Sequence, residues 1–173
     1  RLTGEFQKKG HNITIFVADR ENRLRQIEAL DEIPVYGMYL RSPVSSQYPL
    51  RAMVMCCIWF PITMVQLIWL ARKKRLDAIL IQYPLPAMFY FGILKRIVGG
   101  TLFVTYQGND AHDLSLWDPR EQRLVRFLLE KADLVVGVSR TLLVKVESVL
   151  HGIHLRRSRL LPNGAPLDVI GVV

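Results

Sequence analysis

The chain has 173 residues, 50% of them hydrophobic, and a formal net charge of +8 at pH 7. This length suits one domain with a substantial core rather than two domains, and the hydrophobic content excludes a disordered chain. The positive charge favours a partner with negative charge, such as an anionic membrane surface or a phosphorylated small molecule. We expect no nucleic acid partner, because the basic residues are not interleaved with exposed aromatic side chains or placed on a recognisable nucleic-acid-binding module.

The first part of the chain predicts the end of a helix, two strands and a long helix. Residues 2–9 have the pattern of a helix that is closed by Gly10. Residues 12–17 and 35–39 are apolar enough to form strands, while the residues between them are mostly polar and only weakly helical. A long helix is expected over 50–74.

The rest of the chain alternates strand and helix patterns. The expected strands begin at Asp77, Leu102, Leu134 and Arg159, and the expected helices cover 87–98, 120–131 and 140–150. A near-continuous apolar run bounded by turn residues is typical of a parallel strand that is covered on both faces. The order therefore predicts a doubly wound, mostly parallel α/β sheet with right-handed crossovers.

Polar residues or glycines follow these strands. In doubly wound sheets, ligands bind outside the carboxyl ends of the strands. The candidate binding residues at this edge are Tyr83, Gln107, Gly108, Asn109, Asp110, Ser139, Arg140, Asn163 and Gly164.

Residues 52–71 are apolar apart from Thr63 and Gln66, and a basic cluster at 72–75 follows at once. Their length and this flank meet the criteria for a transmembrane helix, although Pro61 lies near the middle. Three interpretations stay open: a helix that spans a membrane, a core helix whose outer face touches a bilayer, and a buried helix with no membrane role. We favour the second, because a span would place the two halves of one sheet on opposite sides of a membrane.

Cys56 and Cys57 are adjacent within this apolar stretch. Adjacent cysteines have poor geometry for a structural disulfide, and their spacing is not that of metal ligands. They indicate a reducing cytoplasm as the compartment. His11 is expected at a helix end and His151 and His154 at the surface, so we assign no histidine to a metal.

Five segments in a fixed order resemble the motifs of one enzyme family. Residues 10–15 resemble its "GHEVTV" entry to the second strand, and residues 77–84 its "DVIHVHYP" strand. Residues 104–110 resemble the "VVTxHGxD" strand end, residues 132–139 the "ADxVIAVS" strand, and residues 161–164 the "IPNG" sequence before an interdomain linker. The chain therefore resembles the N-terminal, acceptor-binding domain of a family 4 glycosyltransferase with the GT-B architecture.

The resemblance implies a Rossmann-like acceptor-binding domain over residues 1–168, without the first strand of the family's sheet, and the start of a linker over 169–173. It also implies a separate C-terminal domain that holds most of the nucleotide-sugar donor and the groups that stabilise the leaving diphosphate. Such enzymes transfer a sugar with retention of configuration, typically without a metal or other cofactor. We expect the fragment to be inactive alone, with a nucleotide-sugar donor and a glycan or lipid-linked acceptor as partners of the complete enzyme.

The resemblance also assigns roles to several candidate residues. Gln107 falls where the family commonly has His, close to the reacting sugar; Gln cannot take a proton, so His112 is the candidate substitute unless it is a surface histidine. Asp110 either orients an acceptor hydroxyl or satisfies backbone N–H groups in its turn. Ser139 either caps the following helix or contacts the acceptor. Residues 163–164 lead into the cleft in the family, or else form only a turn.

The leading hypothesis is a retaining glycosyltransferase, peripheral at the cytoplasmic face of the membrane, that acts in polysaccharide or glycolipid synthesis. The alternative is a non-catalytic Rossmann-like binding or scaffold domain. This alternative stays open because Gln107 stands where the family commonly has His. A dehydrogenase is disfavoured because no Gly-x-Gly-x-x-Gly follows the strands, and a Walker A lysine loop is also missing. A polytopic membrane protein is disfavoured because there is only one, interrupted, apolar stretch.

Overall fold

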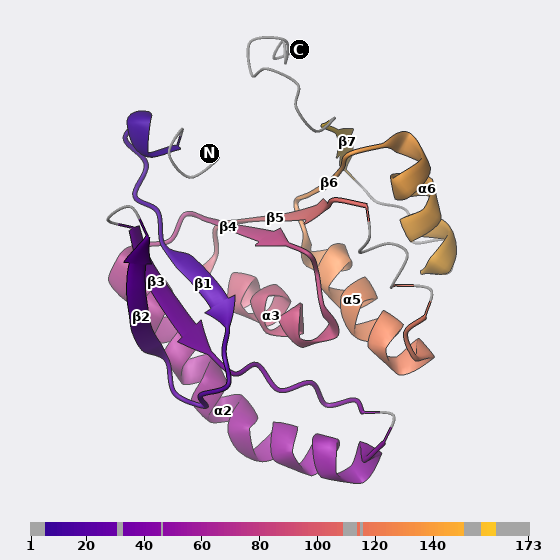
Figure 1. The fold of residues 1–173 in the computed structure, drawn as a ribbon, viewed down its shortest axis with the longest axis horizontal. Coiled ribbons are helices and arrows are strands. Elements are labelled where there is room, and N and C mark those ends of the chain that lie inside the picture. The colour runs from indigo at the N-terminus through magenta and orange to yellow at the C-terminus, as the bar shows by residue number, and fades with distance from the viewer. Residues whose placement is uncertain are drawn as a thin grey trace.

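The computed structural model of the protein describes residues 6–30, 33–45, 47–108, 114, 116–150 and 157–161. Residues 6–8 form a helical turn. The elements that follow are, in chain order, β1 (Ile15–Ala18), β2 (Arg25–Leu30), β3 (Ile33–Met38), α2 (Pro49–Lys74), β4 (Ala78–Gln82), the 3₁₀ helix η1 (Pro86–Met88), α3 (Phe89–Val98), β5 (Thr101–Tyr106), α5 (Pro119–Lys131), β6 (Leu134–Gly137), α6 (Arg140–Val149) and β7 (Ser158–Leu160) (Figure 1).

The described strands form two sheets. In the four-stranded sheet, with the order β4-β5-β6-β7, every neighbouring pair is parallel. The three-stranded sheet has the order β1-β3-β2, with β1 parallel to β3 and β2 antiparallel to it. The predicted Rossmann-like α/β class with a parallel sheet is confirmed. The single continuous sheet is not seen among the described residues, because β1 and β4 are each the outermost strand of their own sheet.

Strand β2 is the element that the sequence analysis missed. The region was expected to be weakly helical, but β2 pairs with β3, with an irregularity between Gln26 and Ala29. Apolar side chains of β2 face solvent, Ile27 being 43% and Leu30 56% exposed. An edge strand with such side chains carries no clear alternation of apolar and polar residues, so backbone pairing with β3 decides its structure.

Helices α2, α3 and α5 pack side by side against the sheets, as Figure 1 shows. The core lies between these helices and the strands. Its largest fully buried side chains include Met38, Leu67, Tyr90, Leu94, Leu102, Tyr106 and Leu128. The alternating burial of β5 shows that one face of this strand supplies the core.

Local signals explain where the helices begin and end. Pro49 opens α2, where its missing N–H is not needed. Arg75 closes α2 in the left-handed conformation, with φ at 49°. The side chain of Asp118 and that of Glu121 form a reciprocal capping box at the start of α5. Both cysteines in α2 are free thiols; Cys56 is buried and Cys57 is exposed.

Candidate functional site

The carboxyl ends of β4 and β5 bring two predicted site residues together. The two strands are parallel with Gln82 opposite Thr105, so the residues that follow them leave the sheet at the same edge. There the Tyr83 hydroxyl donates a hydrogen bond to Oε1 of Gln107, with 3.0 Å between the oxygens. Tyr83 is 50% exposed and has a φ of 57°, a left-handed conformation that costs an ordinary residue roughly 1–2 kcal/mol. The turn after β4 thus holds the phenol against Gln107 in an accessible position.

Gly108 follows Gln107 directly. Its φ of 118° is accessible mainly to glycine. No atom lies within 4 Å of the position that a Cβ would take, so the backbone conformation, and not a lack of space, calls for glycine. Among the other predicted residues, Asn109, Asp110, His112, Asn163 and Gly164 lie outside the described residues, and their roles stay predictions.

Ser139 and Arg140 lie at the end of β6, as the sequence predicted. The Ser139 hydroxyl accepts a hydrogen bond of 3.2 Å from the backbone N–H of Leu142, which makes Ser139 the N-cap of α6. Arg140 is the first residue of that helix, and its side chain is exposed. The capping role of Ser139 is therefore observed, whereas contact between either residue and an acceptor stays a prediction.

A cavity of about 390 Å³ lies at the carboxyl ends of β1 and β3, beside the loop that follows β4. It is lined by Ala18, Asp19, Arg20, Tyr39, Leu40, Leu85, Ala87 and Met88. Because Leu85 belongs to the same loop as Tyr83, this cavity and the Tyr83–Gln107 pair flank one strand-end region. A carboxylate, a guanidinium and a phenol at one cavity can bind sugar hydroxyls and a phosphate group.

Hydrogen bonds fix the charge of Asp19 in this cavity. One carboxylate oxygen accepts from the backbone N–H of Arg20 at 2.7 Å, and the other forms an ion pair with Arg25 at 2.9 Å. These two contacts, the backbone one first, lower the pKa of Asp19 below its usual value. Asp19 is thus an anionic hydrogen-bond acceptor at neutral pH, not a proton donor.

Sequence analysis missed the residues of this cavity. The rule that points to polar residues just after a strand could have identified part of it, because Asp19 and Arg20 are the first polar residues after β1. Tyr39 was predicted to be the last residue of a strand, and the place of Tyr39 and Leu40 beside Asp19 depends on the pairing of β1 with β3. Among the described residues, no group of His, Cys, Asp and Glu side chains is placed to hold a metal ion.

The outer face of α2 is apolar and exposed. Of the described helices, α2 alone is long and apolar enough to cross a membrane, and only 28% of its most apolar window is buried. The exposed apolar side chains on α2 are Leu50, Met53, Val54, Ile58, Ile62, Val65 and Trp69. They recur every three or four residues and so form a continuous stripe along one face of the helix. The structure therefore does not show a fully buried helix.

Basic side chains surround the C-terminal end of this stripe. Arg72, Lys73 and Arg75 are exposed, and the Lys73 ammonium lies over the Trp69 ring, 4.4 Å from its centroid. The opposite face of α2 is buried through Cys56, Met64 and Leu67, among others, and packs beside α3. The helix therefore belongs to the folded domain on one side and presents apolar and cationic groups on the other.

Comparison with known proteins identifies a family. A family model with the description Glycosyltransferase Family 4 matches residues 1–169, which is nearly the whole chain. No protein in a search of curated sequences matches the chain.

Proposed function

The chain belongs to glycosyltransferase family 4, and we propose that it is the acceptor-binding half of a GT-B enzyme. In this proposal the complete enzyme transfers a sugar, with retention of configuration, from a nucleotide-sugar donor to a glycan or lipid-linked acceptor. A second domain supplies most of the donor site, so the chain is inactive alone. The observation that carries the acceptor role is the exposed strand-end region, where the Tyr83–Gln107 pair lies beside the cavity that Asp19 and Arg20 line.

The described residues can bind and orient an acceptor at this region. Asp19 accepts hydrogen bonds from sugar hydroxyls, and Arg20 offers a guanidinium to a phosphate or to further hydroxyls. The Gln107 amide can both donate and accept, but it cannot take a proton. If the reaction requires a base from this half, His112 is the candidate that we propose.

The exposed stripe of α2 supports a membrane-bound acceptor. Helix α2 has an exposed apolar face that includes Trp69 and Leu50 and a basic last turn, and an exposed apolar helix face beside Lys and Arg can rest in a membrane interface. Each Lys or Arg near an anionic surface contributes about 1 kcal/mol to binding. Because α2 also packs beside α3, we propose that it lies on the bilayer and does not span it. The domain then sits at the cytoplasmic face of the membrane, where a lipid-linked acceptor is within reach.

Flotation with lipid vesicles tests the acceptor role. The chain is mixed with phosphatidylglycerol vesicles that do or do not contain a polyprenyl-phosphate-linked sugar. We expect the lipid-linked sugar to strengthen binding, and Arg20→Ala to remove that increment while leaving binding to plain phosphatidylglycerol vesicles unchanged. Arg123→Ala, at an exposed position of α5, is the matched control. An equal affinity for both kinds of vesicle would contradict the acceptor role.

One observation favours a second candidate function. Gln107 stands where the family resemblance leads us to expect His, and its side chain is held by Tyr83. A domain of this kind could bind a glycan or a lipid-linked sugar without taking part in chemistry. The two candidates differ in turnover: the enzyme joined to its donor-binding domain releases nucleotide diphosphate when acceptor is added, whereas a binding domain does not.

A further inference from the structure

The two polar residues within the apolar stretch of α2, Thr63 and Gln66, contact different parts of the molecule. Thr63 is buried, and its hydroxyl bonds to that of Tyr90 in the neighbouring helix α3. Gln66 is half-buried, and its Oε1 accepts a hydrogen bond from the backbone N–H of Leu24, in the loop between β1 and β2. Thr63 therefore joins α2 to the core, whereas Gln66 joins it to a loop.

This loop, residues 19–24, is the one that lines the smaller cavity at the strand ends through Asp19 and Arg20. We call it the acceptor loop. It is held to the chain that follows β3, because the Tyr39 N–H donates a hydrogen bond of 2.6 Å to the Glu21 carbonyl. In Figure 1 both β1 and β3 run toward α2, so the loops that follow these strands reach the helix.

A second contact between the acceptor loop and α2 runs through Arg41. Its Nη2 donates a hydrogen bond of 2.8 Å to Oδ1 of Asn22. The guanidinium lies over the Tyr39 ring and over the Trp59 ring of α2, 4.9 Å and 5.7 Å from their centroids. Its Nε is buried and has no hydrogen-bond partner among the described residues. Asn22 and the two rings therefore account for the position of this cation.

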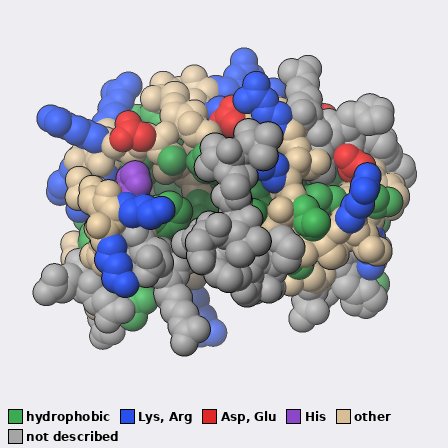
Figure 2. Space-filling view, turned by 90° about the horizontal axis from the view of Figure 1, so that it is seen from above, with side chains coloured by type: hydrophobic (Ala, Val, Ile, Leu, Met, Phe, Trp, Pro, Cys, Tyr) green, Lys and Arg blue, Asp and Glu red, His purple; other side chains and the backbone are tan. Residues whose placement is uncertain are grey.

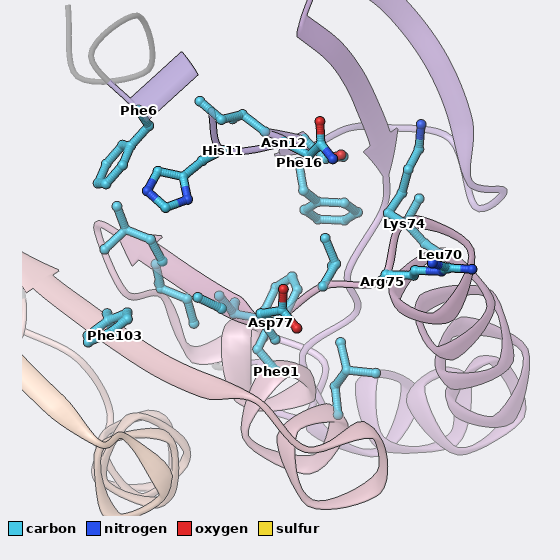
Figure 3. A pocket seen from close by; sticks show the side chains of 18 of the residues that line it. Phe6, His11, Asn12, Phe16, Leu70, Lys74, Arg75, Asp77, Phe91 and Phe103 are labelled. Carbon is cyan, nitrogen blue, oxygen red and sulfur yellow. The ribbon is translucent and has the colours of Figure 1, made fainter. Parts of the chain in front are cut away.

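Both contacts reach α2 along the border of its exposed stripe. Trp59 and Gln66 are about two helical turns apart, so they lie on the same side of the helix, and both are half-buried. On one flank, Leu70 lines a cavity of about 1060 Å³ between the two sheets (Figure 3). On the other flank, Ile62 and Val65 of the stripe are exposed. The acceptor loop is thus held where the buried face of α2 meets the stripe.

The stripe marks the apolar side of the molecule. Figure 2 is seen from the side away from the N-terminal half of α2, and there hydrophobic side chains lie recessed between Lys and Arg side chains. On α2, in contrast, Leu50 is 70% and Val65 is 66% exposed. A bilayer that receives the stripe therefore lies next to the border at which the acceptor loop is held.

We propose that Gln66 and Arg41 are positioning residues, which hold the acceptor loop in a fixed place beside the membrane-facing stripe of α2. The proposal rests on the proposed function, since it assumes that Asp19 and Arg20 bind a lipid-linked sugar. The phosphate of such an acceptor lies at the level of the lipid headgroups, while its sugar must reach the cavity. With both contacts present the loop is ordered before the acceptor arrives. Without them, binding must also order the loop, which weakens the affinity.

Amide hydrogen exchange at Leu24 tests the contact itself in the full chain without lipid. Gln66→Met has a similar shape but removes the acceptor oxygen, whereas Gln66→Glu retains one. We expect the Leu24 amide to exchange about tenfold faster in Gln66→Met, as for the loss of one hydrogen bond, and near the parent rate in Gln66→Glu. Thr63→Val, at the other polar residue, is the matched control and should leave the rate unchanged. Equal rates in the parent chain and Gln66→Met would overturn the proposal.

Vesicle flotation tests the effect on the acceptor. The affinity for phosphatidylglycerol vesicles with the polyprenyl-phosphate-linked sugar is divided by that for plain vesicles, so that changes in general membrane binding cancel. Gln66→Met and Arg41→Met should reduce this ratio about two- to tenfold. Gln66→Glu and Thr63→Val should retain the parent ratio.

The outcomes separate this proposal from the proposed function. A parent ratio of one contradicts the proposed function, and the positioning proposal fails with it. A parent ratio above one that Gln66→Met and Arg41→Met leave unchanged overturns the positioning proposal alone. An equal fall in Thr63→Val would also overturn it, because a general loss of stability would then explain the effect.

Discussion

The Tyr83 hydroxyl and the Gln107 amide oxygen lie 3.0 Å apart and join the loop after β4 to the loop after β5. Neither residue would be close to the other without the parallel register of the two strands. The hydrogen bond fixes the orientation of the Gln107 amide, which leaves its NH₂ group pointing away from Tyr83. We conclude that Tyr83 positions Gln107 at the edge where acceptors are proposed to bind.

Tyr83→Phe should weaken acceptor binding more than it changes stability. The lost hydrogen bond is exposed, so the free energy of unfolding should fall by less than about 1 kcal/mol. A loss of about 0.5–1.5 kcal/mol in acceptor binding corresponds to a roughly two- to tenfold weaker affinity. Vesicle flotation with the lipid-linked sugar and urea unfolding measure the two effects. Tyr48→Phe, at a residue that is 63% exposed, is the control and should change neither.

Ser139→Ala should destabilise the fold, because the hydroxyl caps α6. The loss of an N-cap costs about 1 kcal/mol, which lowers the melting temperature of a chain of this size by roughly 2–4 °C. Ser139→Asp retains a capping oxygen and should restore the melting temperature. A role in acceptor contact would instead appear as weaker acceptor binding in Ser139→Asp with its stability intact.

Gly100→Ala should be more damaging than Gly99→Ala. Both glycines have positive φ values, 86° and 78°, so each alanine incurs backbone strain of roughly 1–3 kcal/mol. A Cβ at Gly100 would also lie 2.8 Å from the backbone oxygen of Asp77, whereas at Gly99 no atom is within 4 Å. Thermal unfolding of the two variants measures the difference. Equal melting temperatures would show that the turn before β5 relaxes around the added methyl group.

Asp133 should make stability depend on pH in the acid range. One of its oxygens lies 2.6 Å from the Lys95 ammonium, and the other accepts from the Leu102 backbone N–H at 2.8 Å. Burial raises the pKa of Asp133, but these two contacts outweigh burial and lower it. The resulting stabilisation is present above the unfolded pKa of about 3.9 and is lost as the pH falls through the lower folded value.

Urea unfolding between pH 2 and pH 7 measures this dependence. Asp133→Asn should be less stable than the parent chain at pH 7 and should lose less stability on acidification. Lys95→Met should likewise reduce the loss of unfolding free energy between pH 7 and pH 2, because it removes the ion-pair partner of the Asp133 carboxylate. Parallel curves for the parent chain and Asp133→Asn would mean that other carboxyl groups cause the acid sensitivity.

The sequence was sufficient to predict the helices and strands that have a strong hydrophobic pattern. The helix α2 and the strands β4, β5 and β6 were predicted close to their observed bounds, because long apolar runs bounded by Pro, Gly or charged residues have few alternative structures. The edge strand β2 was missed because its exposed Ile27 and Leu30 obscure the period-2 pattern. Strand patterns did not reveal the break between the two sheets, but the family resemblance, in which the first, central strand is missing from residues 1–168, implied unpaired edges on the neighbouring strands, as β1 and β4 have.

Strand-end arguments located part of the site. They placed Tyr83, Gln107 and Ser139 at the carboxyl edge, because parallel strands end together. They did not reveal that Tyr83 binds Gln107, since this contact depends on the register of β4 and β5 and on the left-handed turn at Tyr83. They also missed Asp19 and Tyr39, which share a cavity only through the pairing of β1 with β3.

The most direct test of a membrane-facing acceptor domain is flotation of the chain with phosphatidylglycerol vesicles, with phosphatidylcholine vesicles for comparison. We predict binding to the anionic vesicles that weakens as salt is added. The double variant Ile58→Gln, Val65→Gln should bind at least tenfold more weakly. The matched control replaces Ile97 and Val144, which are 49% and 58% exposed on other helices, and should bind within about twofold of the parent, as expected for near-neutral surface changes. Equal binding by both double variants, or no preference for anionic lipid, would contradict the account.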